Sequence, residues 1–190
     1  MPRATFDDAA RARRVLFYGV TGSGKSTAAS RFGRARGLPI ILVDDAVGWL
    51  PADVAPWTNR DDESMRAIAT ELAAAEEWVF DSAYHQFRDV LFERAQVMIA
   101  LDYPRLLSLG RLVRRTWRRA VDGLETCNGN RENWKQVFSQ DSILRWHFRS
   151  FASKRARMRE MEAAPTGLAP VLRLTHPRQL DGLLAVISRL

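Results

Sequence analysis

The chain has 190 residues, 46% of them hydrophobic, which is enough for one well-packed domain. Its formal charge of +7 suits an anionic partner such as a nucleotide, nucleic acid or an acidic membrane surface, although a general bias toward arginine explains the charge equally well. Cys127 is the single cysteine, so an internal disulfide is excluded and a reducing compartment is expected. The three histidines lack zinc-ligand spacing, and no segment approaches 18 uncharged apolar residues, so we expect no structural zinc and a cytoplasmic, soluble protein.

Short apolar runs alternate with helical patterns along the chain. The first run is followed by a helix to about Arg36, which Gly37 closes. Later helices are expected over 61–77, from about His85 to Arg94, over 105–121, from Arg131 to about Ala163 in two pieces, and over 177–190. The five expected strands cover 14–20, 38–46, 78–82, 96–104 and 169–177.

Turn residues mark the breaks between these elements. Residues 122–130 are turn-rich and predict a flexible loop, and Ser139 or Asp141 would cap the second piece of the helical region that follows. Strands that alternate with helices predict a parallel sheet covered on both faces. We therefore expect an α/β fold of the open three-layer αβα kind.

Residues 19–26 read GVTGSGKS and complete the pattern GxxxxGK[ST], between an expected strand and an expected helix. The glycines allow backbone conformations in which successive N–H groups converge on phosphate oxygens at a helix N-terminus. Lys25 is one of three lysines in an arginine-rich chain, and a compact ammonium fits inside a ring of amides where a guanidinium does not. Lys25 should reach the β- and γ-phosphates, Ser26 should ligate Mg²⁺, and Thr27 should lie near the α-phosphate. The expected nucleotide-binding residues are Gly19, Thr21, Gly22, Ser23, Gly24, Lys25, Ser26 and Thr27.

Carboxylates follow two other expected strands. Asp81 comes after three apolar residues, as in a Walker B strand, and would hold Mg²⁺ through water if its strand lies beside that of the loop; helix capping is the alternative. Asp44 and Asp45 end the second strand, at the edge where open α/β sheets bind ligands. They would hold a second substrate, act as general base toward its hydroxyl, or assist the metal. Trp49 and Trp57 either form a wall for that substrate or serve packing alone.

The helix over 105–121 is rich in arginine. At helical spacing its arginines share one face, which would clamp a migrating phosphoryl group or simply face solvent. The arginines of this face are Arg111, Arg114, Arg115 and Arg118, and the residues expected to face the core are Leu106, Leu109, Leu112 and Val113.

A second basic run covers residues 145–160. It interleaves arginine with Trp146, Phe148 and Phe151, a pattern that suits nucleic acid. We expect these aromatic rings to pack inward instead.

Together these residues resemble the small P-loop kinases similar to adenylate kinase, and most closely the branch often labelled DNA topology modulation proteins. The resemblance covers nearly the whole chain. Besides GVTGSGKS it includes "LPIILVDDAVGW", "EEWVFDSAYH", "VMIALDYP" with the Arg-rich helix, and "NGNRENW…SQDSILRW". Members of this branch commonly have Asp-Gly-Asn-Tyr after the third strand, whereas this chain has Asp81, Ser82, Ala83 and Tyr84, so acceptor contacts at that turn do not carry over, and AMP is not singled out as the acceptor.

The resemblance implies a P-loop NTPase fold with strand order 2-3-1-4-5, and ATP with Mg²⁺ as the phosphoryl donor. It implies that an Arg-rich lid, over about 111–135 within a single domain 1–190, places its arginines around the transferred group. It also implies that the loop from Thr175 to Arg178 lies against the adenine.

The leading hypothesis is an ATP- and Mg²⁺-dependent phosphotransferase. Lys25 would hold the phosphates, Ser26 and Asp81 the metal, and the lid arginines would stabilise the transition state. The acceptor, a nucleotide or another small molecule, would bind near Asp44, Trp49 and Tyr84. The alternative is an ATP-binding regulator that contacts nucleic acid through its basic helices without kinase turnover. Neither hypothesis involves a membrane, and the oligomeric state is left open.

Overall fold

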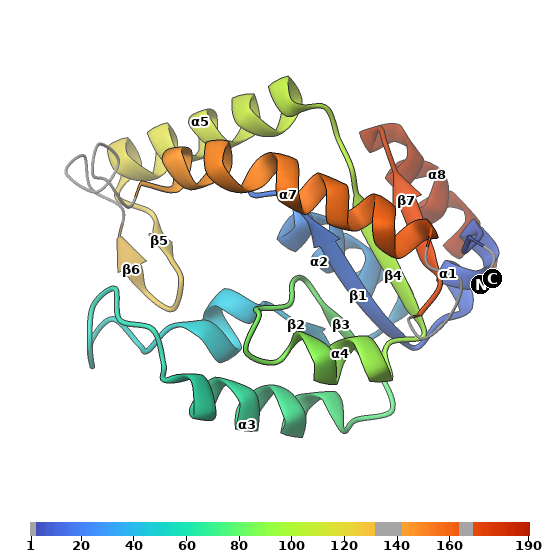
Figure 1. Cartoon of the computed structure of the whole chain (residues 1–190), viewed down its shortest axis with the longest axis horizontal. Helices are drawn as coiled ribbons and strands as arrows, with labels where there is room; N and C mark the ends of the chain where they lie inside the picture. Colours follow the sequence, from blue (N-terminus) through green and yellow to red (C-terminus); the bar gives the residue numbers. More distant parts are fainter. Residues whose placement is uncertain (1–2, 132–141, 164–168) are drawn as a thin grey trace.

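The first strand, β1 (Arg14–Gly19), is the central strand of a parallel sheet with the order β2-β3-β1-β4-β7. The structure is a computed structural model and describes residues 3–131, 142–163 and 169–190. All four strand pairings in this sheet are parallel, which confirms the expected α/β fold and the expected order of its five strands (Figure 1). The other strands are β2 (Ile40–Ile41), β3 (Trp78–Phe80), β4 (Val97–Leu101) and β7 (Val171–Leu174).

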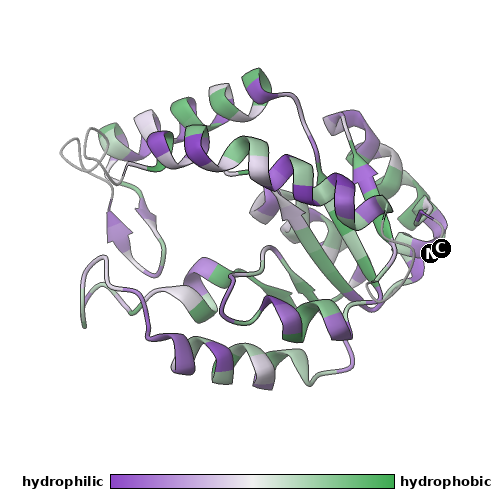
Figure 2. Cartoon of the chain, in the orientation of Figure 1, coloured by the Kyte–Doolittle hydropathy of each residue, from purple (hydrophilic) through white to green (hydrophobic). Residues whose placement is uncertain are grey.

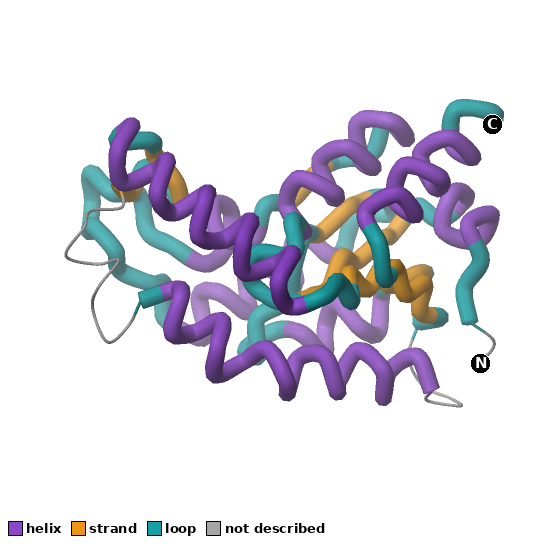
Figure 3. Tube along the Cα trace, turned by 90° about the horizontal axis from the view of Figure 1, so that it is seen from above, coloured by secondary structure: helices purple, strands orange, loops and turns teal. Residues whose placement is uncertain are grey.

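Helices lie on both sides of this sheet, as the view from above shows (Figure 3). Most of them follow the expected pattern, and Gly37 ends α2 in the left-handed conformation. The helix α4 begins at Arg88 rather than His85, because residues 85–87 form a turn that is anchored by the buried ring of Phe87. The helices are α1 (Phe6–Arg11), α2 (Lys25–Arg36), α3 (Asp62–Ala73), α4 (Arg88–Arg94), α5 (Arg105–Asp122), α7 (Ile143–Ala163) and α8 (Pro177–Ile187).

Each face of the sheet has its own hydrophobic core. Val15 and Phe17 pack with α1, α2 and α8, whereas Leu16 and the partly buried Tyr18 pack with α3, α4 and α7. This alternation follows from the two-residue period of a strand. Strands β3 and β4 are apolar throughout, β1 and β7 each contain one arginine, and polar residues line the outer helices (Figure 2). Parallel strands that are buried on both sides bring their carboxyl ends to one edge.

The second strand differs from the expectation. We predicted one strand over 38–46, but β2 has only two residues, and Asp44 and Asp45 lie in the wide helical turn η1 (Asp44–Gly48) that follows it. The amides of Asp45 and Ala46 donate to the carbonyl oxygen of Leu42, so the backbone turns as soon as it leaves the sheet. The two carboxylates therefore leave a helical turn rather than a strand end.

The core-facing side of α5 was also predicted wrongly in part. Leu112 is buried as expected, but Leu106 is 84% exposed and Val113 is 46% exposed. The buried stripe consists of Ser108, Leu112 and Thr116. This stripe packs against the backbone of the 19–26 loop, because a Cβ on Gly22 would come within 2.3 Å of the Ser108 carbonyl oxygen. Because α5 approaches the loop so closely at Gly22, the buried stripe of α5 has small residues such as Ser108 at this point.

The helix α7 lies beside α5 and is fastened to the sheet by Asp102, which follows β4 (Figure 1). Asp102 is 1% exposed, and its carboxylate oxygens contact Arg155 at 2.6 Å, Arg159 at 3.5 Å and Arg173 at 3.0 Å. Arg173 also pairs with Glu162 at 2.6 Å. Two arginines of the second basic run, Arg155 and Arg159, therefore form ion pairs within the protein.

The aromatic residues of α7 do not all pack inward, which corrects our prediction. Phe151 is 7% exposed, but Trp146 and Phe148 are about half exposed, at 49% and 54%. Both rings lie near cations: the Arg105 guanidinium is 4.7 Å from the Phe148 centroid, and the Lys154 ammonium is 5.8 Å from that of Trp146.

The region expected to be a flexible loop contains a hairpin of β5 (Glu125–Thr126) and β6 (Asn130–Arg131), which are antiparallel. The proposed caps Ser139 and Asp141 lie outside the described residues; within them, Ser142 precedes α7 and its Oγ accepts from the Leu144 amide at 3.3 Å. None of the helices in the described ranges is long and apolar enough to cross a membrane.

Candidate functional site

The loop between β1 and α2, here called the candidate phosphate-binding loop, has the backbone geometry expected of such a loop. Gly22 and Gly24 have φ values of +81° and +91°, which favour glycine. Gly24 is also the N-cap of α2, so no side chain caps the first turn of that helix. A helix N-terminus with uncapped amides attracts anions. Within this turn Lys25 is half-buried, and Ser26 and Thr27 are exposed.

Lys25 faces back into its own loop. Its Nζ donates to the carbonyl oxygen of Val20 at 3.1 Å. Burial lowers the pKa of Lys25 to about 8, and the nearby charge of Lys154 acts in the same direction, while Asp81 and Asp44 oppose it. The ammonium therefore lies in a poorly solvated place, where the charge of a phosphate would stabilise its protonated form.

Asp81 lies next to this lysine at the end of β3, beside β1, as we expected. It is 3% exposed, and its Oδ1 accepts from the Val43 amide at 2.9 Å. Burial raises the pKa of Asp81, although the nearby Ser26 hydroxyl and the hydrogen bond from the Val43 amide oppose the shift. Asp81 does not cap α4, which begins at Arg88.

Ser26 and Asp81 together offer a hydroxyl and a carboxylate oxygen, which are ligands that Mg²⁺ prefers. The Ser26 hydroxyl is close enough to Asp81 to lower the pKa of its carboxyl, and Lys25 acts on the same carboxyl. The described residues contain no cluster of three or more His, Cys, Asp or Glu side chains that would hold a metal ion unaided. The pair therefore fits an ion that takes most of its ligands from water and a bound phosphate.

Asp44 and Tyr84 form the second part of the site. The Tyr84 hydroxyl donates to Asp44 Oδ1 at 2.5 Å, and burial together with the charge of Asp44 raises the pKa of Tyr84, so the phenol remains a donor. The other carboxylate oxygen of Asp44, Oδ2, lies 4.0 Å from Cys127 Sγ. Trp49 is nearby in sequence, and its ring packs edge-on against that of Trp57 with 5.6 Å between the centroids, a contact that both the substrate-wall and the packing alternatives allow.

The helix α5 brings two of its four predicted arginines to the candidate phosphate-binding loop. Arg111 Nη1 donates to the Ser23 carbonyl oxygen at 3.0 Å. Arg115, one turn further along, is close enough for its charge to lower the pKa of Lys25. Cations from α5 thus border the uncapped end of α2.

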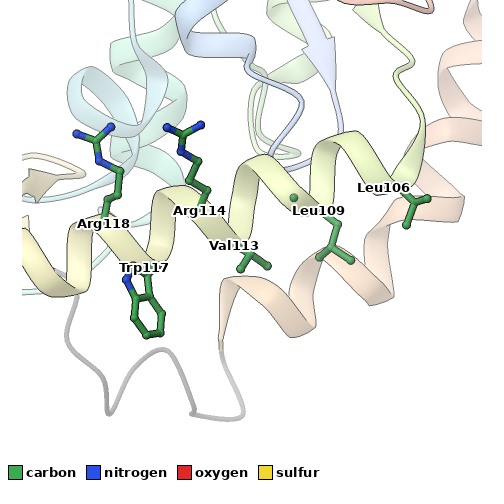
Figure 4. A pocket seen from close by; sticks show the side chains of 7 residues that line it. Leu106, Leu109, Val113, Arg114, Trp117 and Arg118 are labelled. Atoms are coloured by element: carbon green, nitrogen blue, oxygen red, sulfur yellow. The ribbon is translucent and has the colours of Figure 1, made fainter.

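Arg114 and Arg118 lie differently. Both line a hollow on α5 together with Leu106, Leu109, Val113 and Trp117. Figure 4 shows that they leave the helix on one side and that Val113 and Trp117 leave it on the other. Arg118 also pairs with Asp122 of the same helix at 3.9 Å. The apolar lining of this hollow does not suit a phosphate.

The loop before α8, expected beside the adenine, forms a capping box. His176 Nδ1 accepts from the Arg178 amide at 3.2 Å, and Gln179 Oε1 accepts from the amides of Thr175 and His176. The Arg178 side chain is exposed.

Two residues of α7 were missed. Lys154 is half-buried, burial lowers its pKa, and its charge is felt by both Lys25 and Asp44. His147 is fully buried, with Nδ1 2.9 Å from the Thr21 carbonyl oxygen. The rarity of lysine was the available signal for Lys154. Nothing in the sequence singles out His147.

Comparison with known proteins supplies the fold but no family. No family model matches the chain, and no curated protein matches its sequence. A shikimate kinase from Bacteroides thetaiotaomicron superposes with a TM-score of 0.55 at 14% identity, covering 94% of this chain and 97% of the other. The fold is that of solved small kinases.

Two further structures agree. A shikimate kinase from Acinetobacter baumannii in complex with shikimate has a TM-score of 0.52 at 14% identity, over 97% of this chain and 96% of the other. A gluconokinase from Sinorhizobium meliloti has a TM-score of 0.50 at 19% identity, over 93% and 94%. At such identities the likeness concerns the fold alone.

Proposed function

We propose that the protein is an ATP- and Mg²⁺-dependent phosphotransferase that moves the γ-phosphoryl group of ATP to a hydroxyl group of a small molecule. The observation that carries this proposal is Lys25, half-buried at the uncapped start of α2 between the carboxylates of Asp81 and Asp44. A kinase must also bind an acceptor beside the γ-phosphate. The carboxylate of Asp44 is suited to bind the hydroxyl group of that acceptor.

The donor half uses residues 19–27. The amides of the loop and Lys25 would bind the β- and γ-phosphates, and Ser26 and Asp81 would hold Mg²⁺. When bound, the ion neutralises charge on the phosphates. Arg111 and Arg115 would stabilise the charge of the transferred group, with Arg114 and Arg118 joining them in the proposed lid over 111–135 of a single domain. Lys154 would add a cation from α7, and Arg178 would lie near the adenine.

The acceptor half uses Asp44, Tyr84 and Trp49. Asp44 would accept the proton of the acceptor hydroxyl as its oxygen bonds to the γ-phosphorus, and the bond between that phosphorus and the bridging oxygen of ADP breaks. Tyr84 would orient Asp44 through its hydrogen bond. A carboxylate at this position repels a phosphate acceptor and favours a hydroxyl, so a nucleoside monophosphate is the weaker candidate.

The names of the structural neighbours support the same choice, since shikimate and gluconate carry hydroxyl groups. The finer resemblance, to the DNA topology modulation branch of adenylate-kinase-like proteins, is part of this proposal, as is a cytoplasmic location. The proposed branch rests on the motifs and their order along the chain.

Transfer of radioactive phosphate tests the proposal. The protein is incubated with γ-labelled ATP, Mg²⁺ and a panel of sugars, sugar acids, hydroxy acids, nucleosides and nucleoside monophosphates. We expect label on a hydroxyl compound, and Asp44→Asn should slow its transfer by about 10²-fold or more with little change in ATP affinity. Absence of transfer to every compound, with equal ATP hydrolysis by both proteins, would contradict the proposal.

A further inference from the structure

The tip of the β5–β6 hairpin has an unusual backbone. Cys127, Asn128 and Gly129, here called the hairpin tip, have φ values of +46°, +62° and +86°. Three successive left-handed residues are costly unless the surroundings hold them, and Asn and Gly tolerate this conformation best. The shape of the tip is therefore maintained by its contacts.

Asn128 supplies three of these contacts, all to the segment that follows η1 or to η1 itself. Its amide donates to Asp45 Oδ1 at 2.8 Å, and its Nδ2 donates to the Trp49 carbonyl oxygen at 3.0 Å. Its own carbonyl oxygen accepts from the Ala52 amide at 3.0 Å. Asn128 thus binds the tip both to η1, which contains Asp44, and to the segment that follows η1.

Asn130, in β6, adds two further hydrogen bonds that hold the hairpin. It is 2% exposed, its Oδ1 accepts from the Trp57 amide at 2.6 Å, and its Nδ2 donates to the Cys127 carbonyl oxygen at 2.6 Å. The first bond ties the hairpin to the loop, and the second fixes the start of the tip. Trp57 itself has a φ of +51°, so the loop is also held in a demanding conformation.

These bonds place Cys127 directly over Asp44, with 4.0 Å between Sγ and Oδ2. An acceptor hydroxyl needs about 2.7 Å to hydrogen bond with a carboxylate oxygen. The hydroxyl oxygen cannot fit between the sulfur and Oδ2 at this spacing, so it must approach Asp44 from another side. Oδ1 accepts one hydrogen bond, from Tyr84, and can accept a second.

We propose that the hairpin tip is the outer wall of the acceptor subsite, that Asn128 and Asn130 are the positioning residues that hold this wall in place, and that Cys127 limits the size of the acceptor. This rests on the proposed function only for the identity of the subsite. Asp44 itself is exposed, so the acceptor reaches its carboxylate from the open side, and the tip limits how large a compound fits beside it.

The thiol of Cys127 reports on the wall directly, since it is the only cysteine in the chain. Burial and the charge of Asp44 raise its pKa to about 11, so iodoacetamide should react slowly at pH 8 with the native protein. Asn128→Gly keeps the tip conformation but removes the bond to Trp49, and Asn130→Ala removes both Asn130 bonds. We expect alkylation to become roughly 3- to 10-fold faster in each and at least tenfold faster in the double variant.

Asn59→Ala is the matched control, because this asparagine is exposed on the same loop and should leave the rate unchanged. Melting temperatures identify any variant that fails to fold, and the other variant then carries the test. The proposal would be overturned if the native protein reacted as fast as urea-unfolded protein. It would also be overturned if Asn128→Gly, Asn130→Ala and the double variant reacted only as fast as the native protein. The labelling needs neither ATP nor turnover, so a negative kinase assay does not affect it.

A second measurement concerns acceptor size. With the acceptor found in the transfer assay, Cys127→Leu should raise the acceptor KM at least tenfold and leave the ATP KM within twofold, whereas the control Asn59→Ala should change neither. Equal acceptor KM values for Cys127→Leu and Asn59→Ala would remove Cys127 from the wall, even in an active kinase.

Discussion

Arg111 of α5 donates a hydrogen bond to the main-chain carbonyl oxygen of Ser23, so the Arg-rich helix is fastened to the candidate phosphate-binding loop. The same guanidinium lies 5.6 Å from the centroid of the Tyr103 ring. The position of Arg111 is therefore fixed from two sides before any nucleotide is present. A pre-positioned cation costs little reorganisation during a reaction.

Replacing Arg111 should separate turnover from binding. Arg111→Ala should lower kcat by about 10³-fold, because a cation near the transferred phosphoryl group is lost, and should change ATP affinity much less. Steady-state kinetics and calorimetry measure the two effects. Arg31→Ala, on the exposed side of α2, is the control. Arg114→Ala and Arg118→Ala test the lid role of the other pair, and loss of ATP affinity without loss of kcat would count against it.

Lys25 is the test of the donor site. Lys25→Ala should abolish detectable ATP binding, because the amide ring then lacks its cation, while the melting temperature stays within a few degrees of the native value. Titration calorimetry and thermal unfolding measure both. Unchanged ATP affinity would mean that the loop does not bind the phosphates.

The pH dependence of ATP binding follows from the same lysine. In the free protein the pKa of Lys25 is about 8, and a neighbouring phosphate raises it. Binding therefore takes up a proton above pH 8, and affinity should fall up to tenfold per pH unit as the pH rises through this value. Calorimetry at pH 9 in two buffers of different ionisation enthalpy measures the uptake.

Lys154→Ala provides the control for this pH profile. Because the charge of Lys154 lowers the pKa of Lys25, its removal should move the weakening of ATP binding to higher pH. Lys154→Arg should leave the profile in place. A profile that is flat from pH 7 to 9.5 in all three proteins would contradict the assignment.

Asp102 should matter for stability rather than chemistry. Asp102→Ala leaves three arginines without their shared carboxylate and should cost about 3 kcal/mol, or roughly 6–12 °C in melting temperature. Asp181→Ala, which removes an exposed ion pair with Arg31, should cost about 1 kcal/mol or less. Equal effects of the two changes would show that Asp102 does not anchor α7.

Nucleic acid binding should be weak. Arg155 and Arg159 contact Asp102, which neutralises part of their charge and restrains their side chains. Binding of a labelled DNA duplex, measured by fluorescence anisotropy, should be lost near 0.15 M salt, because contacts to phosphates alone are salt-sensitive. Tight binding that persists at this salt concentration would favour the regulator hypothesis.

The sequence predicted the elements whose signals are local. Strand β1 and the loop up to Lys25 follow from an apolar run and a specific motif, and Gly37 ends α2 as its residue type suggests. The helix α1 was overlooked, although Thr5 and Asp8 form a capping box that the sequence contains.

What could not be predicted depends on distant contacts. The short β2 and the turn η1 depend on the fit of Asp81 against the Val43 amide, and the inward stripe of α5 depends on the nearness of Gly22. The hairpin tip lies over Asp44 although 83 residues separate Cys127 from it. Periodicity carries no information about such pairs.

The alternation of β1 between the two cores fixes the place of the candidate phosphate-binding loop along the strand direction. Val15 and Phe17 belong to one core and Leu16 to the other, so a shift of one residue would move every side chain of the strand into the opposite core. Gly19, which is paired with Leu101, thus cannot slide relative to its neighbours. The register between β1 and β3 therefore fixes where a nucleotide bound at the loop would lie relative to Asp81.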